Sequence, residues 1–170
     1  MFEDYPVEGL SIAQMREAYR GFKVAGHGGR HFRQITTQQF RDELAESREL
    51  IRTHFQQELC GYAYPGGGYN DEIKELVRQA GFRYARTTKN VDGPLPLTDP
   101  LELPSHCHYA SPDFWSKYEE VRKQDGIFYF WGHSYELKNN PALWADLEEK
   151  LARIAADRQA EWIDIIDLFS

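Results

Sequence analysis

The sequence predicts an α/β fold in which mostly parallel strands alternate with helices. Short apolar runs of strand length alternate with longer segments whose apolar residues recur at helical spacing. Three unusual segments, GHGGRH at 26–31, AYPGGGY at 63–69 and WGHSYE at 131–136, begin at or near the ends of predicted strands. Because functional groups in such folds gather beyond the carboxyl ends of strands, these segments also predict where a site lies.

The composition is that of a globular protein with one core. The chain has 170 residues, of which 41% are hydrophobic and 14% aromatic. We therefore expect a single domain over residues 1–170. The net charge is −7, and Lys and Arg form no basic stripe, which argues against a nucleic-acid partner.

The same residues predict where the protein works. No apolar run approaches the ~20 residues that span a bilayer, so no membrane partner is expected. The opening MFEDYPVEG lacks the pattern of a signal peptide, which favours a cytoplasmic location. In that reducing compartment Cys60 and Cys107 are expected to be free thiols.

The first two predicted helices begin at capping boxes. Ser11 with Gln14 opens one, and Thr36 with Gln39 opens the other. A short apolar strand, Phe22 to Gly26, is predicted between them. The second helix should bury a stripe at helical spacing: Phe40, Leu44, Ser47, Ile51 and Phe55.

The middle of the chain is predicted to form two more strands. The first, residues 59–64, runs into a Gly-rich turn at 65–68. A helix follows, capped by Asn70 and stopped at Gly81. The second strand, residues 82–86, leads into a long Pro-rich loop, and loops of that length in compact domains are commonly functional.

The last part should hold a helix at 111–124, a strand at 127–131, a long helix opened by Asn140-Pro141 and a final strand at 162–166. The long helix is expected to face the core with one set of residues: Trp144, Leu147, Leu151 and Ile154.

Two groups of histidines carry possible chemistry. His27 and His31 have the spacing at which two imidazoles can converge on one metal ion, although a Gly-rich turn with two solvated histidines explains the pattern equally simply. His133 follows a strand and suits a proton donor, or else a partly buried histidine bonded to a neighbour. His106-Cys107-His108 offers further ligands but no evident fourth partner.

Aromatic side chains also gather near the predicted strand ends. Flat amphipathic rings give sugars an apolar face with a polar rim, although aromatics in strands are usually core residues. The aromatic residues are Tyr62, Tyr64, Tyr69, Trp131 and Tyr135. The candidate substrate contacts are Tyr64, Pro65, Tyr69 and Trp131.

Taken together, these segments resemble the deacetylase domain of carbohydrate esterase family four, the polysaccharide deacetylase or NodB homology domain. GFKVAGHGGRH resembles its strand with His-x-x-x-His, AYPGGGYNDEIKELVRQAGFRYARTT its Pro turn and following helix, and FYFWGHSYEL its catalytic-histidine segment. Cys107-His108 and WGHSYE are similar to a subgroup of the family. The resemblance runs from about Gly21 to the C-terminus.

The resemblance implies an irregular (β/α) barrel and a metal-dependent hydrolase of carbohydrate metabolism. His27 and His31 would hold a divalent metal, with zinc expected, and His133 would be the catalytic acid. His108 and Glu136 are possible additional site residues. The substrate would be a small acetylated sugar, an amino sugar or a related molecule, cleaved at a carbon–nitrogen bond that is not a peptide bond.

The family's Asp-Asp pair, which supplies the catalytic base and a third metal ligand, has no counterpart here. Three hypotheses follow: an active deacetylase, a catalytically inactive sugar- or metal-binding relic, and an N-terminally shortened chain whose Met1 is not the ancestral start. A barrel without its first strands would expose an edge and an apolar face. The apolar surface would include Phe22 and Val24. We therefore expect a homo-oligomer in which residues 1–10 or the open edge contact another copy. The alternative is that residues 1–10 fold back and close the gap within one chain.

Overall fold

The computed structural model describes residues 10–169 and divides into two compact units. The first comprises Met1–Thr87, Thr98–Leu103 and Asp164–Ser170, and the second comprises Thr88–Leu97 and Pro104–Ile163. Each unit is described by itself. Within the described residues, no helix combines the length and the apolar character needed to cross a bilayer.

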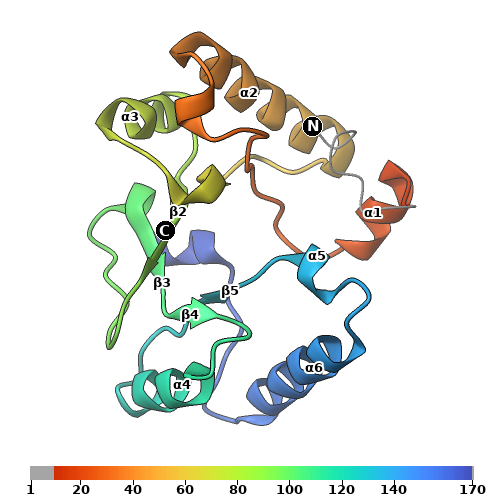
Figure 1. Cartoon of the computed structure of the whole chain (residues 1–170), viewed down its shortest axis with the longest axis vertical. Coiled ribbons are helices and arrows are strands. Elements are labelled where there is room, and N and C mark those ends of the chain that lie inside the picture. The colour runs from red at the N-terminus through yellow and green to blue at the C-terminus, as the bar shows by residue number, and fades with distance from the viewer. Residues whose placement is uncertain (1–9, 170) are drawn as a thin grey trace. The chain divides into compact units, whose positions relative to one another are not determined.

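The helices of the first unit begin where the sequence predicts. They are α1 (Ile12–Ala18), α2 (Thr37–Leu50) and α3 (Asp71–Gln79), shown in Figure 1. Both capping boxes form, because Ser11 and Thr36 accept the expected backbone hydrogen bonds and the partner glutamines bond back. Asn70 caps α3 by accepting a hydrogen bond from the Ile73 N–H at 2.8 Å. A π-helical turn at Ile51–Phe55 extends α2.

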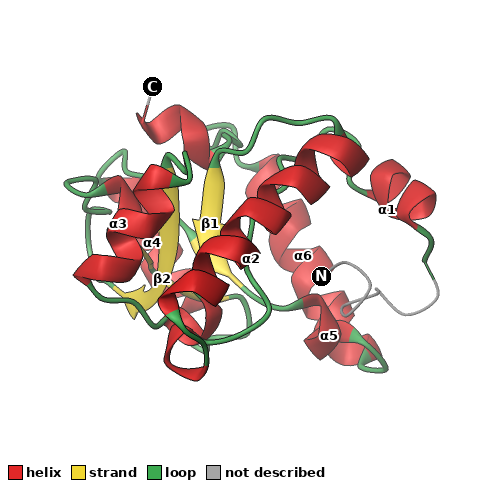
Figure 2. Cartoon of the chain, turned by 90° about the horizontal axis from the view of Figure 1, so that it is seen from above, coloured by secondary structure: helices red, strands yellow, loops and turns green. Residues whose placement is uncertain are grey.

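The first unit contains a pair of parallel strands. β1 (Gly61–Ala63) pairs with β2 (Tyr84–Asn90), which lies between β1 and β3 (Leu103–Ser105) in a three-stranded sheet. α2 and α3 pack against β1 and β2, as Figures 1 and 2 show. Their contact is a cluster of buried residues: Phe40, Leu44, Tyr62, Tyr64, Ile73, Leu76, Val77, Phe82, Ala85 and Leu101.

The strand predicted at Phe22 to Gly26 is reduced to one bridge, so that prediction is wrong for most of its length. Gly26 alone pairs with Tyr62 in β1, and its N–H donates to the Gly61 carbonyl at 2.9 Å. The preceding backbone bonds to a side chain instead of a strand. The Gln57 amide donates to the Phe22 carbonyl and accepts from the Val24 N–H.

The second unit has its own small sheet. β4 (Cys107–His108) and β5 (Phe130–Trp131) are parallel, and His108 lies opposite Trp131. Three helices accompany this sheet: α4 (Phe114–Lys123), α5 (Ser134–Leu137) and α6 (Pro141–Ala156). The buried cluster that joins β4, α4 and α6 consists of Cys107, Phe114, Tyr118 and Ile154, with Phe128 and Phe130 packed against it.

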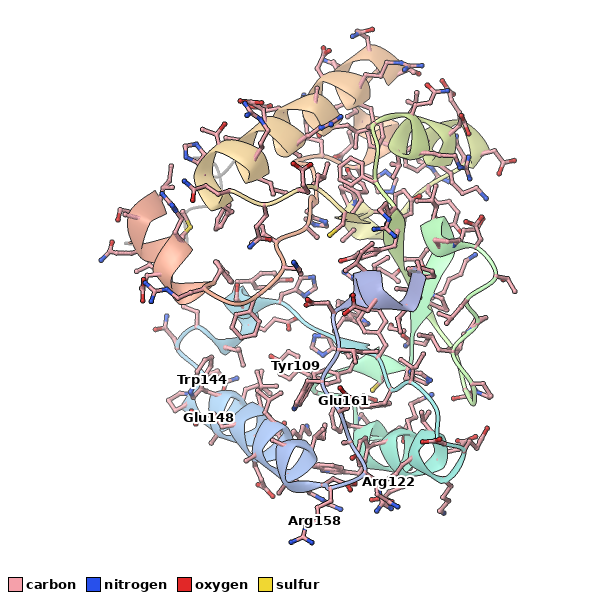
Figure 3. All side chains as sticks on the ribbon, turned by 180° about the vertical axis from the view of Figure 1, so that it is seen from behind. Tyr109, Arg122, Trp144, Glu148, Arg158 and Glu161 are labelled. Carbon is pink, nitrogen blue, oxygen red and sulfur yellow. The ribbon has the colours of Figure 1, made fainter. Side chains whose placement is uncertain are left out.

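The inward face of α6 differs from the prediction. Ile154 is buried as expected, but Trp144 is 50% and Leu151 37% exposed. Trp144 and Glu148 extend from the same side of α6 (Figure 3). Lys150 is buried as well, and its ammonium group donates to the Tyr109 carbonyl at 2.9 Å. The buried face of α6 therefore includes a hydrogen-bonded lysine, whereas the periodicity of the sequence predicts only apolar residues there.

The final strand predicted at 162–166 is also wrong. The segment Ile165–Phe169 forms a 3-10 turn, and Trp162 and Ile163 are exposed. The Phe169 ring stacks on Tyr84 of β2 with centroids 6.3 Å apart, and the Arg83 guanidinium donates to the Phe169 carbonyl at 3.3 Å. Ring stacking and a side-chain hydrogen bond therefore join this segment to the strand without backbone pairing.

The strands make an incomplete form of the predicted architecture. They are arranged as a three-stranded and a two-stranded sheet, and a closed barrel is not formed by the described residues. Residues 1–9 of the segment expected to mediate oligomerisation lie outside the described residues. Phe22 is 66% exposed, in line with an uncovered apolar surface, while the homo-oligomer itself stays a prediction.

Candidate active site

The two predicted metal ligands, His27 and His31, lie near the carboxyl end of β1 and the turn that follows it. His27 is exposed, and its Nδ1 lies 2.8 Å from the carbonyl oxygen of Ala63, the last residue of β1. A carbonyl can only accept, so Nδ1 carries the proton in the neutral ring and Nε2 is the nitrogen with the lone pair. Metal-binding imidazoles commonly have this arrangement, in which one nitrogen donates to a carbonyl and the other ligates.

His31 has the opposite arrangement. Its Nδ1 accepts the Arg33 N–H at 3.2 Å, which places the proton of the neutral ring on Nε2. The ring lies against the Gly-rich turn, where a Cβ on Gly68 would be 2.0 Å from His31 Nε2. In this conformation His31 does not present a lone pair at Nε2. His27 therefore fits a metal as described, whereas His31 fits only after it releases the Arg33 N–H.

A buried carboxylate anchors the loop that carries both histidines. The Glu43 side chain, on α2, is 7% exposed and accepts from the Gly29 N–H at 3.2 Å and from Arg30 Nε at 2.8 Å. Gly28 adopts φ +69°, and a Cβ there would lie 2.7 Å from the Tyr62 hydroxyl. Glu43 was not predicted from the sequence, although a carboxylate beside the apolar stripe of α2 is a signal for such a residue.

Two of the predicted sugar contacts are core residues. Tyr64 is 1% exposed, and its hydroxyl donates to the Leu101 carbonyl at 3.0 Å. Pro65 is buried beside it. Tyr69 is half-buried, stacks on Tyr64 and donates its hydroxyl to Glu102 at 2.8 Å. Tyr64 and Pro65 are thus buried at the turn after β1, and neither exposes a ring face to a sugar.

The second unit holds a separate cluster around one carboxylate. Glu136, on α5, accepts from His133 Nδ1 through Oε1 at 2.9 Å and from His108 Nε2 through Oε2 at 2.8 Å. Oε2 also accepts the backbone N–H of His133 at 3.1 Å. The bond to Glu136 fixes the proton of the neutral His133 ring on Nδ1 and leaves Nε2 to meet another group. The His133 side chain is 37% exposed, so that nitrogen can exchange a proton with a ligand.

The geometry of β4 and β5 brings this cluster together. His108 and Trp131 share one register of the parallel pair, and His133 follows at the carboxyl end of β5. The Trp131 ring meets the His108 and His133 rings edge to face, at 4.8 and 5.1 Å between centroids. Gly132 allows the Tyr109 ring to lie on the chain just before His133, because a Cβ there would be 2.0 Å from Tyr109 Cδ1.

The cluster also contains side-chain atoms that could act as ligands to a metal ion. One ligand atom from each of His108, His133 and Glu136 lies within 4.8 Å of the others, and two imidazoles with a glutamate are a known zinc set. However, His108 Nδ1 accepts the Ala110 N–H at 3.2 Å, so its Nε2 carries a proton toward Glu136. The hydrogen bonds described are therefore those of a metal-free cluster.

Glu136 gives the second unit a testable acid sensitivity. Burial opposes its charged form, but hydrogen bonds from the His133 ring and backbone and from His108 outweigh burial and lower the Glu136 pKa below its usual 4.5. A carboxyl whose pKa falls on folding contributes stability above the unfolded pKa, and this is lost as pH falls through the folded pKa. Below about pH 4.5, the parent should therefore lose more free energy of unfolding than Glu136→Gln.

Urea unfolding between pH 6 and pH 3 measures this difference. Glu148→Gln, at an exposed position of α6, serves as the matched control and should follow the parent. Parallel pH curves for the parent and Glu136→Gln would contradict the described bonds.

Part of the sequence is similar to known proteins. Residues 11–85 match the sequence model of the family described as polysaccharide deacetylase. The chain is also 31% identical over 83 residues to YxkH of Bacillus subtilis (strain 168), which is named as a polysaccharide deacetylase. Residues 11–85 are therefore similar to the polysaccharide deacetylase family. The alignment covers 47% of the chain and 30% of YxkH, so the chain spans about a third of that relative.

One solved structure supports the fold. The deacetylase PplD of Streptococcus pyogenes, solved with acetate, has a TM-score of 0.52 at 22% identity, covering 60% of this chain and 46% of that one. A polysaccharide deacetylase from Bacillus cereus has a TM-score of 0.47 at 24% identity, covering 58% and 33%. At this identity the likeness to PplD shows a shared fold, and the chain spans about half of that protein.

The match to the deacetylase family covers the candidate residues of the first unit only. It includes the loop of His27 and His31 and the turn after β1, and it ends before His108, His133 and Glu136. The structure brings the first pair to β1 and gathers the second group on β4, β5 and α5. The prediction that His133 shares a pocket with His27 concerns two separate units and stays a prediction.

Proposed function

We propose that this chain is a member of the polysaccharide deacetylase family and takes part in the metal-dependent removal of acetyl groups from an amino sugar or a related molecule. The reaction is the hydrolysis of a carbon–nitrogen bond in an acetamido group, which yields acetate and the sugar amine. The family match at residues 11–85 supports the reaction class. The observation that carries the proposal for this chain is the bond between His133 and Glu136.

His133 suits the hardest proton transfer in amide hydrolysis. An amine leaves a tetrahedral intermediate poorly unless its nitrogen is protonated, and a positioned imidazole can supply that proton. Glu136 holds the His133 ring by Nδ1, directs Nε2 outward, and stabilises the imidazolium by its negative charge. Trp131 packs edge-on against the same ring and limits its rotation. These three residues form a proton donor with a fixed direction.

The proposed metal ligands are His27 and His31, and zinc is the proposed ion. A divalent ion bound there would polarise the acetyl carbonyl and make a bound water more acidic. His27 already donates Nδ1–H to the Ala63 carbonyl, as such a ligand requires. His31 must exchange its bond with the Arg33 N–H before its Nε2 can ligate.

Acetate release tests the proposal directly. The intact chain is incubated with N-acetylglucosamine and its short oligomers, with EDTA or with added Zn²⁺ or Co²⁺, and acetate is quantified. We expect release that depends on the added metal and is lost in His27→Ala. No release above that of heat-denatured protein under any metal condition would reject the deacetylase proposal for this chain.

A second candidate is a catalytically inactive sugar- or metal-binding protein. The sequence contains no Asp-Asp pair, and the cluster of His108, His133 and Glu136 has the donor set of a zinc site. Zn²⁺ titration by calorimetry separates the candidates. Binding that is lost in His108→Ala and kept in His27→Ala favours the inactive metal-binding protein, because zinc on His133 would occupy the proposed acid. The reverse pattern favours the hydrolase.

A further inference from the structure

Tyr135 has an unusual position for a large aromatic side chain. It lies in the four-residue helix α5 and is 69% exposed, more than any other large hydrophobic side chain among the described residues. Its ring stacks on His133, with centroids 4.8 Å apart and planes inclined by 27°. One face of the phenol is thus turned toward the proposed acid, while much of the ring remains in solvent.

Core packing does not explain this ring. The buried cluster of the second unit is built from other residues of β4, α4 and α6, and Tyr135 is absent from it. Trp131, the aromatic residue predicted from the sequence as a sugar contact, is only partly exposed and its indole Nε1 is buried. Tyr135 therefore presents the aromatic face beside His133 that a ligand can reach. Exposed aromatic faces are the surfaces on which the apolar side of a pyranose ring stacks.

The stacking geometry also indicates which sugar unit would be held. A proton donor must lie about 2.6–3.2 Å from the atom it protonates. The tyrosine ring lies nearly parallel to the imidazole at 4.8 Å, so a sugar on its outer face is separated from His133 by the phenol itself. That sugar cannot carry the acetamido group that His133 serves. It can be the neighbouring unit of an oligosaccharide.

We propose that Tyr135 is a substrate-binding residue that stacks on the pyranose next to the acetylated unit of an oligosaccharide. This inference rests on the proposed deacetylase function for the role of His133. The stacking itself is a binding event, and it is measurable whether or not acetate is released.

Calorimetric binding of N-acetylglucosamine and of its β-1,4-linked trimer tests the inference. The parent should bind the trimer more tightly than the monomer. Tyr135→Ala should weaken trimer binding about 3–10-fold and leave monomer binding unchanged, since one aromatic stacking contact has about that effect. Tyr135→Phe, which retains the flat ring, should stay within about 2-fold of the parent.

Trp144→Ala is the matched control, because Trp144 is another exposed aromatic of the same unit and has no described ring contact with His133. Its trimer affinity should equal that of the parent. Three results overturn the inference: equal trimer affinity for Tyr135→Ala and the parent, an equal loss in Trp144→Ala, or no preference of the parent for the trimer. A loss confined to Tyr135→Ala, without acetate release by the parent, supports stacking and rejects the deacetylase function.

Discussion

Replacing His133 by asparagine should lower the rate of acetate release from an N-acetylated sugar by about 10²–10⁴-fold, the usual contribution of a positioned general acid. Asparagine keeps a polar side chain that Glu136 can bond, but it has no proton to transfer near neutral pH. The loss should appear because Nε2 of His133 is the atom that Glu136 leaves available. Single-turnover acetate measurements on parent and variant give the ratio.

The identity of the leaving group shows whether the loss reflects proton donation. A sugar amine needs protonation to leave, whereas 4-nitrophenolate leaves without assistance. With 4-nitrophenyl acetate, His133→Asn should therefore lose much less than with the sugar, by less than about 10-fold. His54→Asn is the control, since His54 lies in the turn after α2, and both rates should match the parent. Equal losses on the two substrates would assign His133 a structural role.

Sequence reasoning was most successful where local signals and the fold agree. The capping boxes at Ser11 and Thr36 predicted the starts of α1 and α2 because their hydrogen bonds are made within four residues. The family resemblance found the segments that carry His27, His31 and His133. A family motif and a helix cap both consist of residues close together in the sequence, so both can be recognised without tertiary information.

The parts that could not be predicted depend on contacts between distant residues. Nothing local in Phe22 to Gly26 shows that Gln57 will take its backbone hydrogen bonds. From the sequence, Lys150 would be predicted to be an exposed residue of α6. Its burial is explained by the hydrogen bond to the Tyr109 carbonyl. The direction in which His31 points its ring proton follows from one backbone N–H, which no spacing rule contains.

Glu43 is the distant contact with the largest expected effect on stability. It belongs to α2, yet both carboxylate oxygens bond to the loop that carries the two histidines. Glu43→Ala removes a nearly buried carboxylate and leaves the Gly29 N–H without this acceptor. Removing one member of a buried ion pair costs about 3–5 kcal/mol. Arg30 is 52% exposed and can return to water, so a loss of about 2–3 kcal/mol in the free energy of unfolding is expected.

Two comparisons isolate the anchoring role of Glu43. Glu49→Ala, on the same helix, removes an exposed carboxylate paired with Arg52 and should leave the free energy of unfolding close to that of the parent. Glu43→Gln keeps the shape and one acceptor oxygen, so its loss should fall between the two. Urea unfolding gives these values, and hydrogen exchange at the Gly29 amide reports the loop itself.

The hydrogen-exchange result decides whether Glu43 acts on the site or only on the core. If the carboxylate holds the loop, the Gly29 amide should exchange faster in Glu43→Ala under native conditions, while amides in the middle of α3 keep their protection relative to global stability. Unchanged exchange at Gly29 would show that the Glu43 bond does not anchor the loop. Faster exchange would show that α2 positions His27 and His31, and His27→Ala and Glu43→Ala should then weaken metal binding together.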